Sequence, residues 1–65
     1  MLHAPYNKVK GALREKGYSY AFVAKILKKS VPTVCRKING DADFLVQEAI
    51  ALCKLLNTGL DIFLN

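Results

Sequence analysis

Two serines constrain the fold of this chain more than any other feature. Ser19 and Ser30 each stand directly before a short segment whose apolar residues repeat with helical spacing. Serine is a favoured residue at the start of a helix, because its hydroxyl accepts a hydrogen bond from a free backbone N–H of the first turn. The residues with the spacing of a buried stripe are Val23, Ala24 and Leu27 after the first serine, and Val34 and Ile38 after the second. Only Lys28 and Lys29 remain for a turn, so the sequence predicts two short helices within about residues 19–38.

Three further segments with helical spacing flank this pair. The first runs from about residue 5 or 7 to residue 16 and ends at Gly17, a residue suited to a helix C-terminus. The other two run over about residues 45–56 and, as a short turn or helix, over residues 60–64. No segment alternates polar and apolar residues over a useful length, which argues against a sheet. The sequence therefore predicts a compact all-α chain with five helices.

The length of the chain limits what it can do. A chain of 65 residues buries only about 60% of the surface that its unfolded form exposes, enough for one domain over residues 1–65 but not for two cores. Apolar residues make up 52% of it, so it can bury a core and fold alone or as a dimer. A domain of this size lacks a deep cleft. The sequence shows no paired arrangement of carboxylates of the kind that catalysis uses. The acidic residues are Glu15, Asp41, Asp43, Glu48 and Asp61. We therefore expect no enzyme activity, no cofactor and no small-molecule ligand.

Charge is distributed unevenly along the chain. Residues 1–40 hold nine lysines and arginines against a single glutamate, which gives +8, whereas residues 41–65 hold one lysine against four acidic residues, which gives −3. A basic surface of this kind suits phosphate, because each Lys or Arg that neutralises a DNA phosphate releases a counterion. A solvated, solubilising surface is the alternative interpretation. Charge alone favours a nucleic-acid partner.

The two cysteines and the single histidine do not form a metal-binding pattern. Cys35 and Cys53 lie eighteen positions apart without a CxxC pair, and His3 is close to the N-terminus. Both cysteines are expected on helices, reduced and without a chemical role. No secretion signal is recognisable, and no stretch reaches the roughly 18 apolar residues that a membrane span requires. These features predict a cytoplasmic protein that does not bind membranes.

Residues 19–27 (SYAFVAKIL) and 30–40 (SVPTVCRKING) resemble the helix-turn-helix of the Xre/Cro-like family of phage repressors and Cro proteins. The resemblance covers nearly the whole chain and implies a lambda-repressor-like DNA-binding domain that regulates transcription in a phage or mobile element. It also implies residence in a bacterial cell or phage-infected host, with double-stranded operator DNA as the partner. The chain departs from the family at Lys28, where a glycine is usual, at Lys29, which is usually apolar, and at Leu45, which replaces a hydroxyl cap.

The second helix of such a motif, here residues 30–38, enters the major groove with the side chains of its first turn and next exposed turn facing base edges. Those positions are Val31, Pro32, Cys35 and Arg36. Arg36 is the one residue among them that can bind guanine O6 and N7 in a bidentate manner, worth about 1–3 kcal/mol of base discrimination. Val31 and Pro32 offer only apolar contact, and a thymine methyl group is the expected partner.

The resemblance extends the expected site to residues around this helix. It implies that Tyr20 and Thr33 touch phosphate or bases, and that Lys37, Asn39 and Gly40 lie against the DNA backbone. Lys25, Lys28 and Lys29 are candidates for looser phosphate contact. The predicted DNA-binding residues are Tyr20, Lys29, Ser30, Val31, Pro32, Thr33, Cys35, Arg36, Lys37 and Asn39. The alternative is a solvated helix face for Arg36 and Lys37, and a surface aromatic packed on its own helix for Tyr20.

Apolar residues are in excess in the C-terminal part of the chain. One small core cannot absorb all of them, so a dimer interface is predicted, and it comprises Leu45, Val46, Ile50, Ile62 and Leu64. Burial in the core is the alternative. Two-fold symmetric proteins pair with two-fold symmetric operators, which predicts a homodimer at least on DNA. The competing function is a protein-interaction module, such as an antitoxin or anti-repressor, that uses the same fold.

Overall fold

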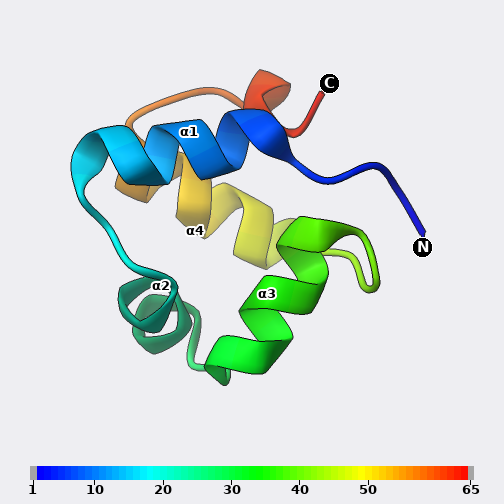
Figure 1. The fold of residues 1–65 in the computed structure, drawn as a ribbon. Helices are drawn as coiled ribbons and strands as arrows, with labels where there is room; N and C mark the ends of the chain where they lie inside the picture. Colours follow the sequence, from blue (N-terminus) through cyan, green and yellow to red (C-terminus); the bar gives the residue numbers. More distant parts are fainter. Residues whose placement is uncertain (1, 65) are drawn as a thin grey trace.

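The computed structural model describes residues 2–64 and contains only helices in this range (Figure 1). The four α-helices are α1 (Asn7–Lys16), α2 (Tyr20–Leu27), α3 (Val31–Asn39) and α4 (Val46–Leu56), and a 3₁₀ turn, η1 (Leu60–Phe63), follows them. The prediction of an all-α chain is confirmed for these residues. The prediction of five helices is not, because the last segment forms a single 3₁₀ turn of four residues rather than an α-helix.

Both serines cap the helices that follow them. Oγ of Ser19 accepts the backbone N–H of Phe22 at 3.1 Å, and Oγ of Ser30 accepts that of Thr33 at 3.4 Å. α1 ends at Gly17 with a φ of 74°, in the left-handed region that glycine adopts at little cost. α2 ends in the same way at Lys28, whose φ is 58°. The turn between α2 and α3 therefore keeps the left-handed geometry that glycine usually provides, with a lysine in its place.

The start of α4 lacks a hydroxyl cap, and a carboxylate instead holds the residue that precedes the helix. Leu45 precedes the helix and has no polar side chain, but its backbone N–H donates to Oε1 of Glu48 at 2.9 Å. Phe44, one residue earlier, packs its ring against Tyr6 and Phe63, with centroid distances of 6.0 and 5.6 Å. The hydrogen bond to Glu48 and the packing of Phe44 thus hold the start of α4 in place, although no side chain accepts a hydrogen bond from its first turn.

The elements form one compact unit of 26 × 24 × 21 Å. α4 lies against α1 and α2, α2 packs on α3, and η1 lies over the start of α1 (Figure 1). The core is formed where these helices meet, and its fully buried side chains are Val9, Leu13, Val23, Val34, Ile38 and Leu52. Ala24 is also buried on the face of α2, at a position where a small side chain lets neighbouring helices approach. With their inner faces in the core, α2 and α3 leave the outer face of α3 open to solvent.

Candidate nucleic-acid interface

The outer face of α3 holds most of the residues predicted to read DNA. Val31, Pro32 and Arg36 are exposed, and Cys35 and Asn39 are half-buried beside them. Val34 and Ile38 occupy the opposite face and are fully buried. The helix therefore presents one continuous stripe in which Arg36 is the only charged side chain.

The first turn of α3 is held by a hydroxyl pair. Oγ of Ser30 and Oγ1 of Thr33 are hydrogen-bonded at 2.8 Å, and the former also caps the helix. Each hydroxyl has two acceptor lone pairs, so this pair still has capacity for an outside donor or acceptor. Both residues lie at the N-terminal end of the stripe, close in sequence to Val31 and Pro32.

Tyr20 opens α2 and is half-buried at the junction between α1, α2 and α3. Burial is the main reason that the pKa of its hydroxyl is raised, with the nearby Cys35 adding to the shift and Arg14 opposing it. The hydroxyl therefore stays protonated and can donate a hydrogen bond. Together with Ser19, Tyr20 lines a pocket of about 320 Å³ at the N-terminus of α2.

Two cations of α1, Lys10 and Arg14, line the same pocket and were absent from the predicted site. The free N–H groups at a helix N-terminus attract anions, and two cationic side chains beside them strengthen that attraction. Their spacing of i and i+4 places both on one side of α1, a signal present in the sequence. What the sequence does not show is that this side of α1 faces the start of α2.

Lys37 was predicted to lie against the DNA backbone, but the structure places it between α3 and α4. Its side chain is buried, and its Nζ donates a hydrogen bond to Oε1 of Glu48 in α4. It points away from the outer stripe of α3 because position 37 follows Arg36 by about 100° around the helix. In this conformation the Lys37 ammonium joins α3 to α4 and is not part of the outer stripe of α3.

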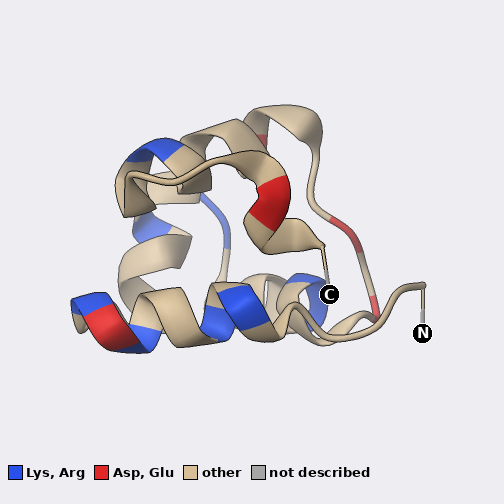
Figure 2. Ribbon diagram, turned by 90° about the horizontal axis from the view of Figure 1, so that it is seen from above, with Lys and Arg blue, Asp and Glu red and all other residues tan. Residues whose placement is uncertain are grey.

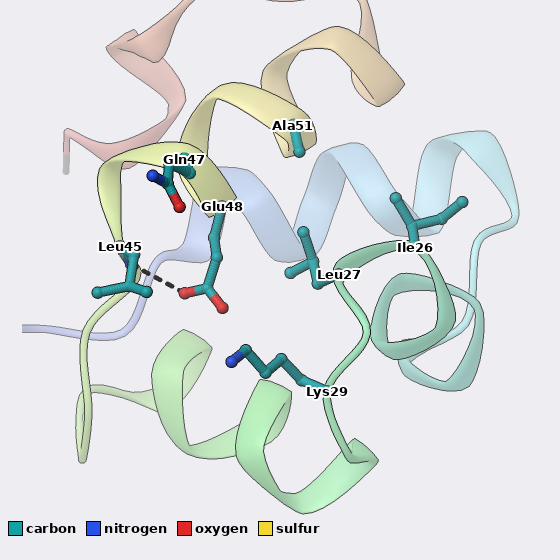
Figure 3. A pocket seen from close by; sticks show the side chains of 7 residues that line it. All are labelled: Ile26, Leu27, Lys29, Leu45, Gln47, Glu48 and Ala51. Carbon is teal, nitrogen blue, oxygen red and sulfur yellow. Dashed lines mark hydrogen bonds between the residues drawn. The ribbon is translucent and has the colours of Figure 1, made fainter.

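Lys29 belongs to a second pocket, between α2 and the start of α4. The pocket has a volume of about 260 Å³ and is lined by Ile26, Leu27, Lys29, Leu45, Gln47, Glu48 and Ala51. Figure 3 shows the Lys29 ammonium directed toward the Glu48 carboxylate, whose Oε2 is buried without a hydrogen-bond partner. Lys25 in the last turn of α2 and Lys28 at its C-terminus are both exposed. Lys29 is exposed, and its positive charge helps to lower the pKa of Glu48.

The predicted dimer surface divides into exposed and buried members. The exposed fractions are 75% for Val46, 66% for Leu64, 57% for Leu45 and 42% for Ile50. Ile62 is 8% exposed and belongs to the core, so its assignment to an interface is wrong. Its side chain turns inward because η1 folds back onto α1 and α4, which the apolar run around it did not reveal. Leu60, which was not predicted, is 56% exposed.

Charge separates the two parts of the molecule as the sequence indicated. The acidic residues other than Glu15 lie on the segment after α3, on α4 and on η1 (red in Figure 2), whereas α1, α2 and α3 with their connections carry nine of the ten cations. The outer face of α3 and the N-terminus of α2 both lie in the basic part. Within residues 2–64, no cluster of His, Cys, Asp or Glu is placed to hold a metal ion. Both cysteines are free thiols.

No helix in the described range is long and apolar enough to pass through a bilayer. Comparisons of the chain with protein-family models, with curated proteins and with solved structures found no significant match.

Proposed function

We propose that this chain is a sequence-specific DNA-binding regulator of transcription, similar to phage repressors and Cro proteins and belonging to a phage or mobile element. In this proposal α2 and α3 form a helix-turn-helix, and α3 enters the major groove, whose width of about 12 Å admits an α-helix. The observation that carries the proposal is the exposed stripe of α3, with Arg36 at its centre and its opposite face anchored in the core.

The stripe supports direct contacts to only a few bases, one of them polar and the others apolar. Arg36 is exposed and free to form a bidentate pair with guanine O6 and N7. Val31 and Pro32 supply apolar contact to a thymine methyl group, and half-buried Cys35 adds no charge. Direct contacts of this kind specify few base pairs, so the sequence dependence of DNA shape contributes to recognition.

Phosphate contacts are proposed on both sides of the stripe. At the N-terminus of α2, the pocket lined by Lys10, Arg14 and Tyr20 offers two cations and a hydroxyl to one phosphate group. At the turn between α2 and α3, the exposed side chains of Lys28 and Lys29 offer a further contact. Lys37 is left out of this set because its ammonium is bound to Glu48.

A homodimer on operator DNA completes the proposal. Leu45, Val46, Ile50 and Leu64 present exposed apolar side chains, with Leu60 as an addition to the original set. Two copies related by a two-fold axis would place their α3 helices about 34 Å apart, one turn of DNA. A protein that acts on an operator in this way works in the cytoplasm of a bacterial cell or phage-infected host.

Selection of bound sequences from random duplex DNA tests the proposal. We expect a common half-site that contains a guanine, and Arg36→Ala should relax the preference at that base pair while the rest of the site is retained. Lys54→Ala, which removes an exposed cation near the end of α4, is the matched control and should leave the selected site unchanged. Selected sequences without a common half-site, or equal binding to RNA and duplex DNA, would contradict a specific operator.

The exposed apolar side chains also favour a second candidate function, a protein-interaction module such as an antitoxin or anti-repressor. The two functions differ in what covers this surface, a second copy of the chain or a different protein. Light scattering of the protein with and without a selected DNA site distinguishes them. A dimer on DNA supports the regulator, whereas a monomer that stays monomeric at saturating DNA supports the interaction module.

A further inference from the structure

The N-terminal arm, residues 2–6, is fastened to the end of α3. The backbone N–H of Leu2 donates to the carbonyl oxygen of Gly40, and that of Tyr6 donates to the carbonyl oxygen of Ile38 at 2.9 Å. Between these two bonds the arm passes the segment 40–43 that leads from α3 toward α4. The arm therefore packs on the residues that end α3 rather than extending into solvent.

His3 occupies the centre of this contact, with a carbonyl oxygen facing each ring nitrogen. Nδ1 lies 2.7 Å from the oxygen of Ala4, and Nε2 lies 2.9 Å from the oxygen of Ala42. A neutral imidazole carries one N–H and can donate to only one of two carbonyls, whereas an imidazolium donates to both. With a neutral ring, one nitrogen lone pair would face a carbonyl oxygen. The arrangement around His3 is therefore complementary to the protonated ring.

The charges around His3 favour the same form. Nε2 lies 3.6 Å from Oδ1 of Asp43, and the ring stacks on Tyr6 with centroids 4.0 Å apart. The Tyr6 hydroxyl in turn donates to Oδ1 of Asp43 at 2.7 Å. Lys37, the charged residue of α3 near this cluster, directs its ammonium to Glu48 and only its backbone carbonyl toward His3. The hydrogen bond to Ala4, then that to Ala42 and the charge of Asp43, raise the pKa of His3 against the opposing effect of burial.

We propose that His3 is a proton-dependent latch, which as an imidazolium fastens the N-terminal arm to segment 40–43 and on losing its proton releases it. The latch goes beyond the proposed DNA-binding function and can be tested without DNA. Its geometry couples a group that titrates near neutral pH to the residues that end α3.

The direction of the pH dependence follows from the preference for the charged form. A group whose pKa is raised in the fastened state stabilises that state fully below its ordinary pKa of about 6.5. The stabilisation is lost as the pH rises through the raised value. Asp43 stays ionised throughout this range because the hydrogen bond from Tyr6 is the main cause that lowers its pKa. Tyr6 stays protonated because burial raises its pKa to about 12.

An NMR titration of the full chain from about pH 5 to about pH 9 tests the latch, since this interval brackets the ordinary range of histidine. We expect His3 to titrate above about 6.5. The backbone amides of Leu2 and of residues 40–43 should shift with the same midpoint. Above it, the Leu2 amide should lose protection relative to its intrinsic exchange rate at the same pH. A His3 pKa at or below the ordinary value, or amides that do not follow it, would overturn the proposal.

Two variants separate the latch from a general charge effect. Asp43→Asn keeps an acceptor for the Tyr6 hydroxyl but removes the negative charge, and it should lower the pKa of His3. Glu15→Gln removes an exposed carboxylate from α1 and should leave that pKa unchanged. His3→Gln should abolish the shared midpoint at residues 40–43, while unchanged amide shifts at Val9 and Leu52 report an intact core. If both carboxylate variants lower the pKa of His3 equally, the assigned role of Asp43 is wrong and the latch fails.

Discussion

Nζ of Lys37 in α3 lies 2.5 Å from Oε1 of Glu48 in α4, and both side chains are almost fully buried. The same oxygen accepts the backbone N–H of Leu45, so one carboxylate both binds α3 and holds the first residue before α4. Burial by itself raises the pKa of Glu48, but the hydrogen bonds from Lys37 and Leu45 outweigh it and keep the pKa below its ordinary value. The helix proposed to enter the major groove, α3, is thus joined to α4 by a buried ion pair.

Removal of the lysine from this pair should destabilise the fold strongly. Lys37→Met leaves the Glu48 carboxylate buried and without its partner, and we expect the free energy of unfolding to fall by about 3 kcal/mol. Urea denaturation at neutral pH measures the loss. Lys54→Met, an exposed position in α4, is the control and should change stability by no more than about 0.5 kcal/mol. Equal losses in the two variants would mean that the pair contributes no more than a surface charge.

Lys37 and Lys25 should also differ in their effect on DNA binding, a prediction that rests on the proposed function. Lys25 is exposed near the turn between α2 and α3, whereas the Lys37 ammonium is bound to Glu48. Lys25→Met should reduce the slope of log affinity against log salt by about 1, because one phosphate contact and its counterion are lost. Lys37→Met, measured at a temperature where the variant is folded, should leave the slope unchanged. The reverse result would place Lys37 on the DNA backbone.

Acid should destabilise the protein through Glu48 and Asp43. The pKa values of both carboxyls are lowered in the folded state, that of Asp43 mainly by the hydrogen bond from Tyr6. Groups of this kind contribute stability above their unfolded pKa values, about 4, and lose it as the pH falls through the folded values. The free energy of unfolding, measured by urea denaturation between about pH 6 and pH 2, should therefore fall. Glu48→Gln should flatten this dependence, and an unchanged slope would contradict the assigned pKa shift.

The α-helices were predictable because their signals are local. Ser19, Ser30 and Gly17 act on the backbone within one turn, and the apolar spacing of α2 and α3 needs no knowledge of the rest of the fold. The exposure of Arg36 follows from the same spacing, since Val34 and Ile38 define the inner face.

The remainder of the candidate site depends on contacts between elements that are distant in the sequence. Lys37 and Glu48 are eleven residues apart, and no local pattern pairs them. The same holds for Lys10 and Arg14, which reach Tyr20 only because α1 passes beside the start of α2. Burial of the apolar segment around Ile62 depends on the direction in which η1 folds back, and an unbroken apolar run does not determine that direction.

Gly11 offers a direct stabilisation of α1. It lies inside the helix at an exposed position, and a Cβ added there would meet nothing within 4 Å. Gly11→Ala should raise the free energy of unfolding by about 1 kcal/mol, because glycine loses more backbone entropy in a helix than alanine. Gly17→Ala is the informative contrast, since a φ of +74° is strained for alanine even though space is available. Thermal and urea unfolding should show a gain in the first variant and a loss in the second.

Lys28 carries backbone strain that a glycine would relieve. Its φ of 58° places a residue with a Cβ in the left-handed region, which costs roughly 1–2 kcal/mol relative to the right-handed helix. Lys28→Gly should therefore stabilise the fold, by about 1 kcal/mol after the greater freedom of glycine in the unfolded chain is included.

Lys28→Ala removes the same charge but keeps the Cβ, so it separates backbone strain from charge repulsion with the neighbouring Lys25 and Lys29. We expect urea denaturation to show a gain for glycine and none for alanine. An equal gain for both would assign the effect to charge, and a loss for glycine would mean that the turn tolerates its lysine without strain. Under the proposed function, both variants should weaken DNA binding alike, because the phosphate contact depends on the ammonium and not on the backbone.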